Sequence, residues 1–237
     1  MDDTKEKNKT EAQKNIDRIT KKRLAIVERL MKEGVKFIDP LTAYIDEAAV
    51  RGEGTIIYPG VIIEEAVTIG KDCIIGKNSR IKDSVISDGV QIEDSVILSS
   101  KIGENTSVGP YAYLRTGTVI GKDCRIGDFV EIKNSIIGDG TKASHLTYIG
   151  DSDLGRDINL GCGVVFVNYD GIKKHRSTIG DKVFIGCNSN IISPVSIGDN
   201  AYIAAGSTVN EDVPSGNLYI NREREVYSKP DKKNRYK

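Results

Sequence analysis

The chain has 237 residues, with 34 basic and 34 acidic side chains, so no overall charge draws it to nucleic acid or to an anionic membrane. No apolar run reaches the roughly 18 residues of a membrane span, and the charged N-terminus lacks the apolar segment of a signal peptide. The four cysteines show no metal-ligand or redox spacing. We therefore expect a cytoplasmic protein with free thiols, no metal site, and no nucleic-acid or membrane partner.

The N-terminal part of the chain predicts a tail and a helix. Residues 1–10 are polar and are expected to form a flexible tail. Over residues 11–34 apolar residues recur at roughly helical spacing, and Gly34 is a plausible stop. This pattern predicts an amphipathic linker helix packed on a neighbouring surface. Its apolar residues are Ile16, Ile19, Leu24, Val27, Leu30 and Met31.

From residue 35 to residue 214 an aliphatic residue recurs every six positions, with one slip near Ile86. A six-residue period fits neither a helix nor a long strand, but it is typical of a solenoid of short strands joined by turns. Three hexapeptides would close a coil of about 18 residues, and successive coils would stack about 4.8 Å apart. A second, smaller inward residue is expected four places after each aliphatic one, as at Val61, Val67, Cys73, Ser79 and Val85.

Two segments leave the repeat. Residues 167–178 carry no hexapeptide and predict a loop thrown out of one coil, where functional residues are often found. Residues 215–237 form a basic C-terminal tail, which we expect to cover the open end of the solenoid and its unpaired strand edge.

His145 is the best candidate for chemistry, because a near-neutral imidazole can accept a proton at physiological pH. Arg115 and Lys133 each follow an aliphatic residue, where glycine is usual, and they lie 18 residues apart. The coil length predicts that they stack on one face, close to Tyr148. Such a basic stripe suits phosphate or carboxylate. Lys82 occupies the same kind of position, so an ordinary solvated face also remains open.

Four motifs carry a resemblance to a known family. They are Gly109–Arg115 (GPYAYLR), Val130–Lys133 (VEIK), Ala143–Asp151 (ASHLTYIGD) and Asn168–Gly171 (NYDG). Residues 35–225 resemble the acetyltransferase half of the bifunctional bacterial enzyme that makes UDP-N-acetylglucosamine. The resemblance implies an all-β fold, a left-handed parallel β-helix (hexapeptide-repeat solenoid) with an N-terminal α-helix and a C-terminal tail.

The resemblance also implies roles for single residues. His145 would be the general base that frees the amine of glucosamine-1-phosphate to attack acetyl-CoA. The sugar phosphate would be held by Arg115, Lys133, Tyr148, Asn159 and Lys174. Acetyl-CoA would be contacted by Cys162, Asn168, Tyr169, Cys187, Ala205 and Arg222. Cys162, through its backbone N–H, would donate to the oxyanion; it and Cys187 stand where the family has a small residue and a serine.

The family further implies a homotrimer with sites between neighbouring prisms. No segment of this sequence resembles the uridyltransferase half, so we expect acetyl transfer without uridylyl transfer. That half is either a separate protein or part of a longer chain of which this sequence is a piece. Two alternatives remain: a hexapeptide acyltransferase for another amino sugar or an amino acid, and a non-catalytic β-helix scaffold or regulatory subunit. A zinc enzyme of the γ-carbonic-anhydrase type would need three histidines, whereas this chain has 2.

Overall fold

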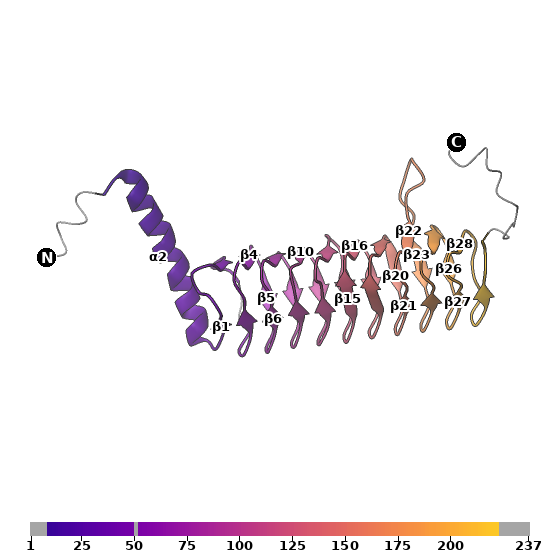
Figure 1. Cartoon of the computed structure of the whole chain (residues 1–237), viewed down its shortest axis with the longest axis horizontal. Coiled ribbons are helices and arrows are strands. Elements are labelled where there is room, and N and C mark those ends of the chain that lie inside the picture. The colour runs from indigo at the N-terminus through magenta and orange to yellow at the C-terminus, as the bar shows by residue number, and fades with distance from the viewer. Residues whose placement is uncertain (1–8, 50–51, 223–237) are drawn as a thin grey trace, which may run out of the picture.

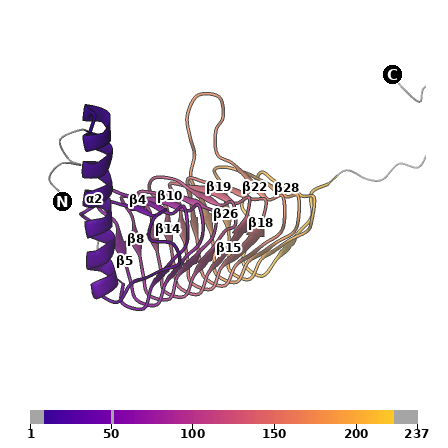
Figure 2. The ribbon, with the colours of Figure 1, turned by 60° about the vertical axis from the view of Figure 1, so that its left-hand side comes forward.

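The computed structural model describes residues 9–49 and 52–222, which form one helix followed by a solenoid of short parallel strands (Figure 1). The strands stack into three sheets of 11, 10 and 8 strands, so the solenoid has three faces (Figure 2). This is the all-β solenoid that the six-residue period predicts. The expected 1–10 and 215–237 tails fall largely outside the described residues.

Each face is one parallel sheet, whose strands follow one another in stacking order. The first face comprises β1 (Lys36–Phe37), β3 (Ile56–Ile57), β6 (Ile74–Ile75), β9 (Gln91–Ile92), β12 (Ser107–Val108), β15 (Arg125–Asp128), β18 (Lys142–His145), β21 (Asn159–Leu160), β24 (Phe184–Ile185), β27 (Tyr202–Ile203) and β29 (Leu218–Tyr219). The second face comprises β2 (Tyr44–Ile45), β4 (Ile62–Glu64), β7 (Arg80–Lys82), β10 (Val96–Leu98), β13 (Tyr113–Leu114), β16 (Glu131–Lys133), β19 (Tyr148–Gly150), β22 (Val165–Val167), β25 (Asn190–Ile192) and β28 (Thr208–Val209). The third face comprises β5 (Thr68–Ile69), β8 (Val85–Ile86), β11 (Lys101–Ile102), β14 (Val119–Ile120), β17 (Ile136–Ile137), β20 (Ser152–Leu154), β23 (Ser177–Ile179) and β26 (Ser196–Ile197).

The aliphatic residue of each hexapeptide points inward and is buried by the coils above and below. Ile75, Ile81 and Ile191 are each 0 % exposed, and the inward positions of the other coils are similarly covered. Buried hydroxyls at the small inward positions bond to the backbone. The Thr55 hydroxyl, for example, donates to the Gly70 carbonyl at 3.0 Å and accepts from the Cys73 N–H at 3.1 Å. The narrow core therefore leaves few polar groups without partners.

The slip near Ile86 is a shortened coil. Ile56 pairs with Ile74, 18 residues on, but Ile74 pairs with Gln91, only 17 on. Because the coil has lost one residue, the inward prediction for Val85 is wrong. Val85 is 43 % exposed, and Ser84, at 2 %, takes the inward place.

Helix α2 (Glu11–Lys32) stands across the N-terminal end of the solenoid (Figures 1 and 2). The Thr10 hydroxyl caps its first turn by accepting from the Gln13 N–H at 3.3 Å. The apolar stripe does not pack along its whole length: Val27 and Leu30 are buried, whereas Ile16 and Ile19 are 56 % and 57 % exposed. Nothing helical in the described part of the chain has the length and apolarity of a membrane span.

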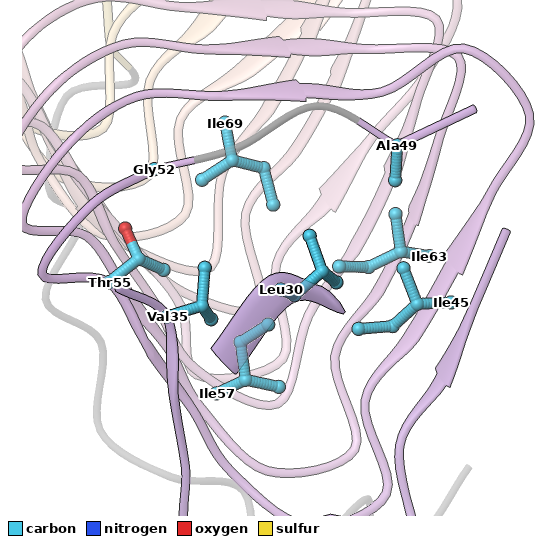
Figure 3. A pocket seen from close by; sticks show the side chains of 9 residues that line it. All are labelled: Leu30, Val35, Ile45, Ala49, Gly52, Thr55, Ile57, Ile63 and Ile69. Carbon is cyan, nitrogen blue, oxygen red and sulfur yellow. The ribbon is translucent and has the colours of Figure 1, made fainter. Parts of the chain in front are cut away.

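Leu30 closes the open end of the first coil. Its side chain lies at the centre of a small apolar cavity, facing inward side chains of the first coils (Figure 3). The cavity is lined by Leu30, Val35, Ile45, Ala49, Gly52, Thr55, Ile57, Ile63 and Ile69. The helix therefore acts as a hydrophobic plug that keeps water from the end of the core.

We expect Leu30→Ala to lower the free energy of unfolding by about 2–3 kcal/mol, because it removes a buried side chain and enlarges an existing cavity. Ile16→Ala is the matched control and should change stability by less than about 0.5 kcal/mol, because its side chain is already in water. Urea denaturation of both variants measures the difference. Equal stabilities for the two would show that the helix does not plug the core.

Candidate active site

His145 and Asp128 form a hydrogen-bonded pair where the first face turns into the second. They end strands β18 and β15 and are paired in register, with Nδ1 of His145 2.6 Å from Oδ1 of Asp128. Opposite an ionised carboxylate, Nδ1 carries the proton, so in the neutral ring Nε2 is the nitrogen with the lone pair. The hydrogen bond from His145 lowers the pKa of Asp128, which therefore stays ionised at neutral pH. The imidazole is 56 % exposed and accessible to a substrate.

Asp128 is a site residue that the six-residue period does not single out. It lies 17 residues before His145, whereas an ideal coil stacks residues that are 18 apart. The spacing is 17 because the turn between β16 and β17 is one residue shorter than usual, and the pairing of β15 with β18 places the carboxylate beside the imidazole.

Four predicted residues occupy equivalent turn positions in successive coils and line one edge of the solenoid. We call His145, Cys162, Cys187 and Ala205 the corner column. Backbone hydrogen bonds fix their alignment: Gly163 N–H donates to Leu146 O at 2.9 Å, Asn188 N–H to Cys162 O at 2.8 Å, and Gly206 N–H to Cys187 O at 2.8 Å. The chain thus brings the candidate base and three of the residues expected to contact acetyl-CoA into a single row.

Arg222, another residue expected to contact acetyl-CoA, lies at the far end of this row. Its Nη1 donates to the Ala205 carbonyl at 3.1 Å. The corner column therefore runs from an imidazole–carboxylate pair at one end to a guanidinium at the other.

Arg115 and Lys133 stack on the second face, as their 18-residue spacing predicts. Leu114 pairs with Ile132, so the residues that follow lie on adjacent coils. The guanidinium of Arg115 also contacts Glu131, with Nη1 2.7 Å from Oε1, and this contact raises the pKa of Arg115. The arginine is thus held in place by a carboxylate on the same face.

Tyr148 approaches the basic stripe across Gly150. In register it lies beside Glu131, while Lys133 lies beside Gly150. A Cβ atom on Gly150 would come within 2.5 Å of the Tyr148 hydroxyl. The tyrosine ring therefore leans over Gly150, because any side chain at position 150 would collide with it. Its hydroxyl is close enough to Arg115 and Lys174 to interact with their charges.

Lys174 comes from the extruded loop and approaches Lys133. Its side chain lies within hydrogen-bonding reach of Lys133 and is the main cause of a lowered pKa for Lys133, followed by desolvation. Two ammonium groups so close repel each other, and an anion between them would relieve the repulsion. We call Arg115, Lys133, Tyr148 and Lys174 the basic cluster.

The loop of residues 168–176 is anchored at its base by a buried carboxylate. Asp151 is 7 % exposed and accepts hydrogen bonds of 2.5 Å from the side-chain amides of Asn134 and Asn168. Asn168 is itself 6 % exposed, so its amide supports the loop. β22 ends at Val167 and β23 begins at Ser177, so both ends of the predicted 167–178 loop lie in strands.

His175, the second histidine, closes the same loop. Its Nε2 lies 2.6 Å from Oδ2 of Asp170, and its backbone N–H donates to the Asn168 carbonyl at 2.8 Å. The contact with His175 is the main cause of a strongly lowered pKa for Asp170. Tyr169 is 55 % exposed, and its hydroxyl donates to the Gly171 carbonyl at 2.8 Å.

Asn159 does not join the basic cluster. It begins β21 on the first face and pairs with Lys142, three positions before the corner column. A single chain therefore holds Asn159 and the basic cluster on different faces. Among the described residues no group of three or more His, Cys, Asp or Glu is arranged to hold a metal ion.

Comparisons with known proteins agree with the repeat and with the motifs. The model of the GMPPB C-terminal domain matches residues 44–137, and that of the six-repeat bacterial transferase hexapeptide matches residues 176–211. The chain is 56 % identical over 204 residues to the bifunctional protein GlmU of Acetivibrio thermocellus, which covers 86 % of this chain and 44 % of that protein. It is 54 % identical to GlmU of Clostridioides difficile, again over 86 % and 44 %.

Solved structures show the same fold. UDP-N-acetylglucosamine acyltransferase from Campylobacter jejuni superimposes with a TM-score of 0.54 at 22 % identity, covering 79 % of this chain and 72 % of that one. The LpxA acyltransferase of Bacteroides fragilis gives a TM-score of 0.50 at 19 % identity, covering 75 % and 69 %.

The chain is thus built from six-residue repeats, and its fold is the left-handed parallel β-helix predicted from the motifs. Over most of its length its sequence is similar to part of the bifunctional GlmU proteins. It spans less than half the length of the curated relatives that it matches.

Proposed function

We propose that this protein transfers the acetyl group of acetyl-CoA to the amine of glucosamine-1-phosphate, in the route to UDP-N-acetylglucosamine. The observation that supports this most directly is the His145–Asp128 pair, which fixes a proton-accepting nitrogen at the turn between the first face and the second, the face on which the basic cluster lies. A scaffold or regulatory subunit would need neither feature. No uridylyl transfer is assigned to these residues.

In the proposed reaction Nε2 of His145 accepts a proton from the sugar amine as the amine attacks the thioester carbonyl. Asp128 acts as a positioning residue: it holds Nδ1–H, and it stabilises the imidazolium once the proton has moved. The carbonyl oxygen becomes an oxyanion, and the backbone N–H of Cys162, on the coil next to His145, is the proposed donor to it.

The basic cluster is proposed to hold the substrate phosphate. A dianion placed between Lys133 and Lys174 would replace their mutual repulsion with two attractive contacts. The Tyr148 hydroxyl can add a hydrogen bond from above Gly150. This arrangement favours a phosphorylated acceptor over an uncharged amino sugar or an amino acid.

Acetyl-CoA is proposed to lie along the corner column, with its thioester near His145 and its phosphates toward Arg222. The row of small or exposed residues at Cys162, Cys187 and Ala205 gives an extended surface, and a guanidinium binds phosphate oxygens well. The loop side chain of Tyr169 is exposed and available for a further contact, whereas the Asn168 amide is engaged by Asp151.

Three copies are proposed to assemble side by side. Within one chain Asn159 cannot reach the basic cluster. A neighbouring subunit could bring its own first face, with its Asn159, opposite that cluster. Exposed apolar side chains line the same edge as His145: Tyr111, Phe129 and Leu146 are each 58 % exposed, and the first two rings stack with centroids 5.5 Å apart. Such a surface is typical of an interface.

Sedimentation equilibrium at micromolar concentration should therefore give the mass of a trimer. Phe129→Asp should shift the protein toward monomer, because it places a charge in the proposed interface. A wild-type monomer would contradict the assembly.

The activity is tested with acetyl-CoA and glucosamine-1-phosphate, by following free thiol release. His145→Ala should lower kcat by about 10²–10⁴-fold, because the proton acceptor is lost. Asp128→Ala should lower kcat less, by about tenfold, and Asp128→Asn should recover part of that loss because its carbonyl can still accept from Nδ1–H. If His145→Ala kept the wild-type rate, His145 would not be the proton acceptor. If the wild type were inactive in this assay, glucosamine-1-phosphate would not be the substrate.

The phosphate site is tested by KM. Lys133→Ala should raise KM for glucosamine-1-phosphate by about tenfold or more, because a charge-assisted hydrogen bond is lost. Lys82→Ala is the matched control: Lys82 stands at the same position of an earlier coil, where it pairs with Glu65 at 2.9 Å. An equal effect of both substitutions would mean that the stripe is only a solvated face.

A further inference from the structure

Two thiols lie side by side in the corner column. Leu160 and Ile185 are paired in register, and each is followed two residues later by a cysteine, Cys162 and Cys187. The Asn188 N–H donates to the Cys162 carbonyl at 2.8 Å, so the two turns are directly stacked. Stacked coils lie about 4.8 Å apart. Cα atoms at about that separation fall within the range that a disulfide can bridge.

The Cys187 sulfur points toward the coil that carries Cys162. A Cβ atom on Gly161 would lie 2.9 Å from Sγ of Cys187, so this sulfur rests over the bare backbone next to Cys162. Both thiols are exposed. A larger residue at position 161 would occupy this space, so the glycine leaves the sulfur free to move toward its neighbour.

The other two cysteines behave differently. Cys73 and Cys124 are 0 % and 2 % exposed, and burial raises the pKa of both thiols. Their S–H groups lie 3.1 and 3.2 Å from backbone carbonyl oxygens. They belong to the core, and thiolate chemistry is disfavoured there. The exposed pair is thus chemically distinct within the same chain, which also supplies an internal control.

We propose that Cys162 and Cys187 are a paired-thiol site that a low-molecular-weight disulfide oxidises reversibly to an intramolecular disulfide. One thiolate attacks a sulfur of the small disulfide, forming a mixed disulfide and releasing one small thiol. The second protein thiolate then attacks the protein sulfur of that bond and releases the other small thiol. Two protein thiols lose two electrons and two protons, and the small disulfide is reduced to two thiols.

The site lies one coil from His145, in the row proposed for acetyl-CoA. A disulfide would draw two adjacent turns together and place a covalent bridge beneath the thioester. The regulatory consequence rests on the proposed function: oxidation should block acetyl transfer, and reduction should restore it. The formation of the bond does not depend on that function.

The bond is tested on the native protein with oxidised glutathione as the probe. In the reduced protein two of the four thiols should react at once with an aromatic disulfide reagent, and the other two only after unfolding. After oxidation the fast pair should vanish, and peptide mass spectrometry should find Cys162 joined to Cys187. Cys162→Ser and Cys187→Ser should each keep one fast thiol and take up glutathione instead. Wild-type protein carrying glutathione on both cysteines, or only intermolecular disulfides, would overturn the proposal.

The consequence is tested by comparing each protein with itself before and after oxidation. Oxidised wild type should lose about tenfold or more of its acetyl-transfer rate, because sub-ångström to ångström displacements in a site have effects of this size. Dithiothreitol should restore the rate. If the Cys162–Cys187 peptide forms but the reduced protein shows no acetyl transfer, the proposed function is refuted and the paired-thiol site stands. If the protein catalyses acetyl transfer but oxidation yields no Cys162–Cys187 peptide, the paired-thiol site is refuted and the proposed function stands.

Discussion

The parallel hydrogen bonds between successive coils determine the rest of the structure. Arg115 N–H donates to Ile132 O at 2.8 Å, and Tyr148 N–H to Val164 O at 3.1 Å, and this pattern continues along each face. The strands have only two to four residues, so no long strand or helix runs through the core to align one coil with the next. These hydrogen bonds between coils therefore determine which side chains stack on one another. The inward aliphatic residues exclude water from the hydrogen bonds.

The candidate site lies where side chains depart from this regularity. β15 and β18 extend by one pair to bring Asp128 beside His145, and an extruded loop carries Lys174 back to the second face. Gly150, at a position where a side chain would point outward, lets the Tyr148 ring lean across to the basic stripe. Each break leaves the neighbouring coils in register, because the backbone hydrogen bonds resume directly after it.

The six-residue period was enough to predict the solenoid, its buried ladder and the stacking of Arg115 on Lys133. It could not predict features that depend on how long each coil is. The inward prediction for Val85 failed for this reason, and Asp128 was missed. Cys162 and Cys187 are 25 residues apart, a spacing with no meaning until the loop between them is known to leave the coil. The apolar stripe of α2 predicted a helix correctly but not that only its last turns are covered.

The rigid prism also explains why one chain holds its candidate groups on separate faces. A side chain on a short strand of a stacked ladder cannot swing to the next face without breaking hydrogen bonds above and below it. Asn159 is therefore confined to the first face, and the basic cluster to the second. A loop can cross that distance, as Lys174 does, but a strand residue can meet the cluster only from another molecule. The same rigidity that fixes His145 against Asp128 thus favours a site completed by a neighbouring subunit.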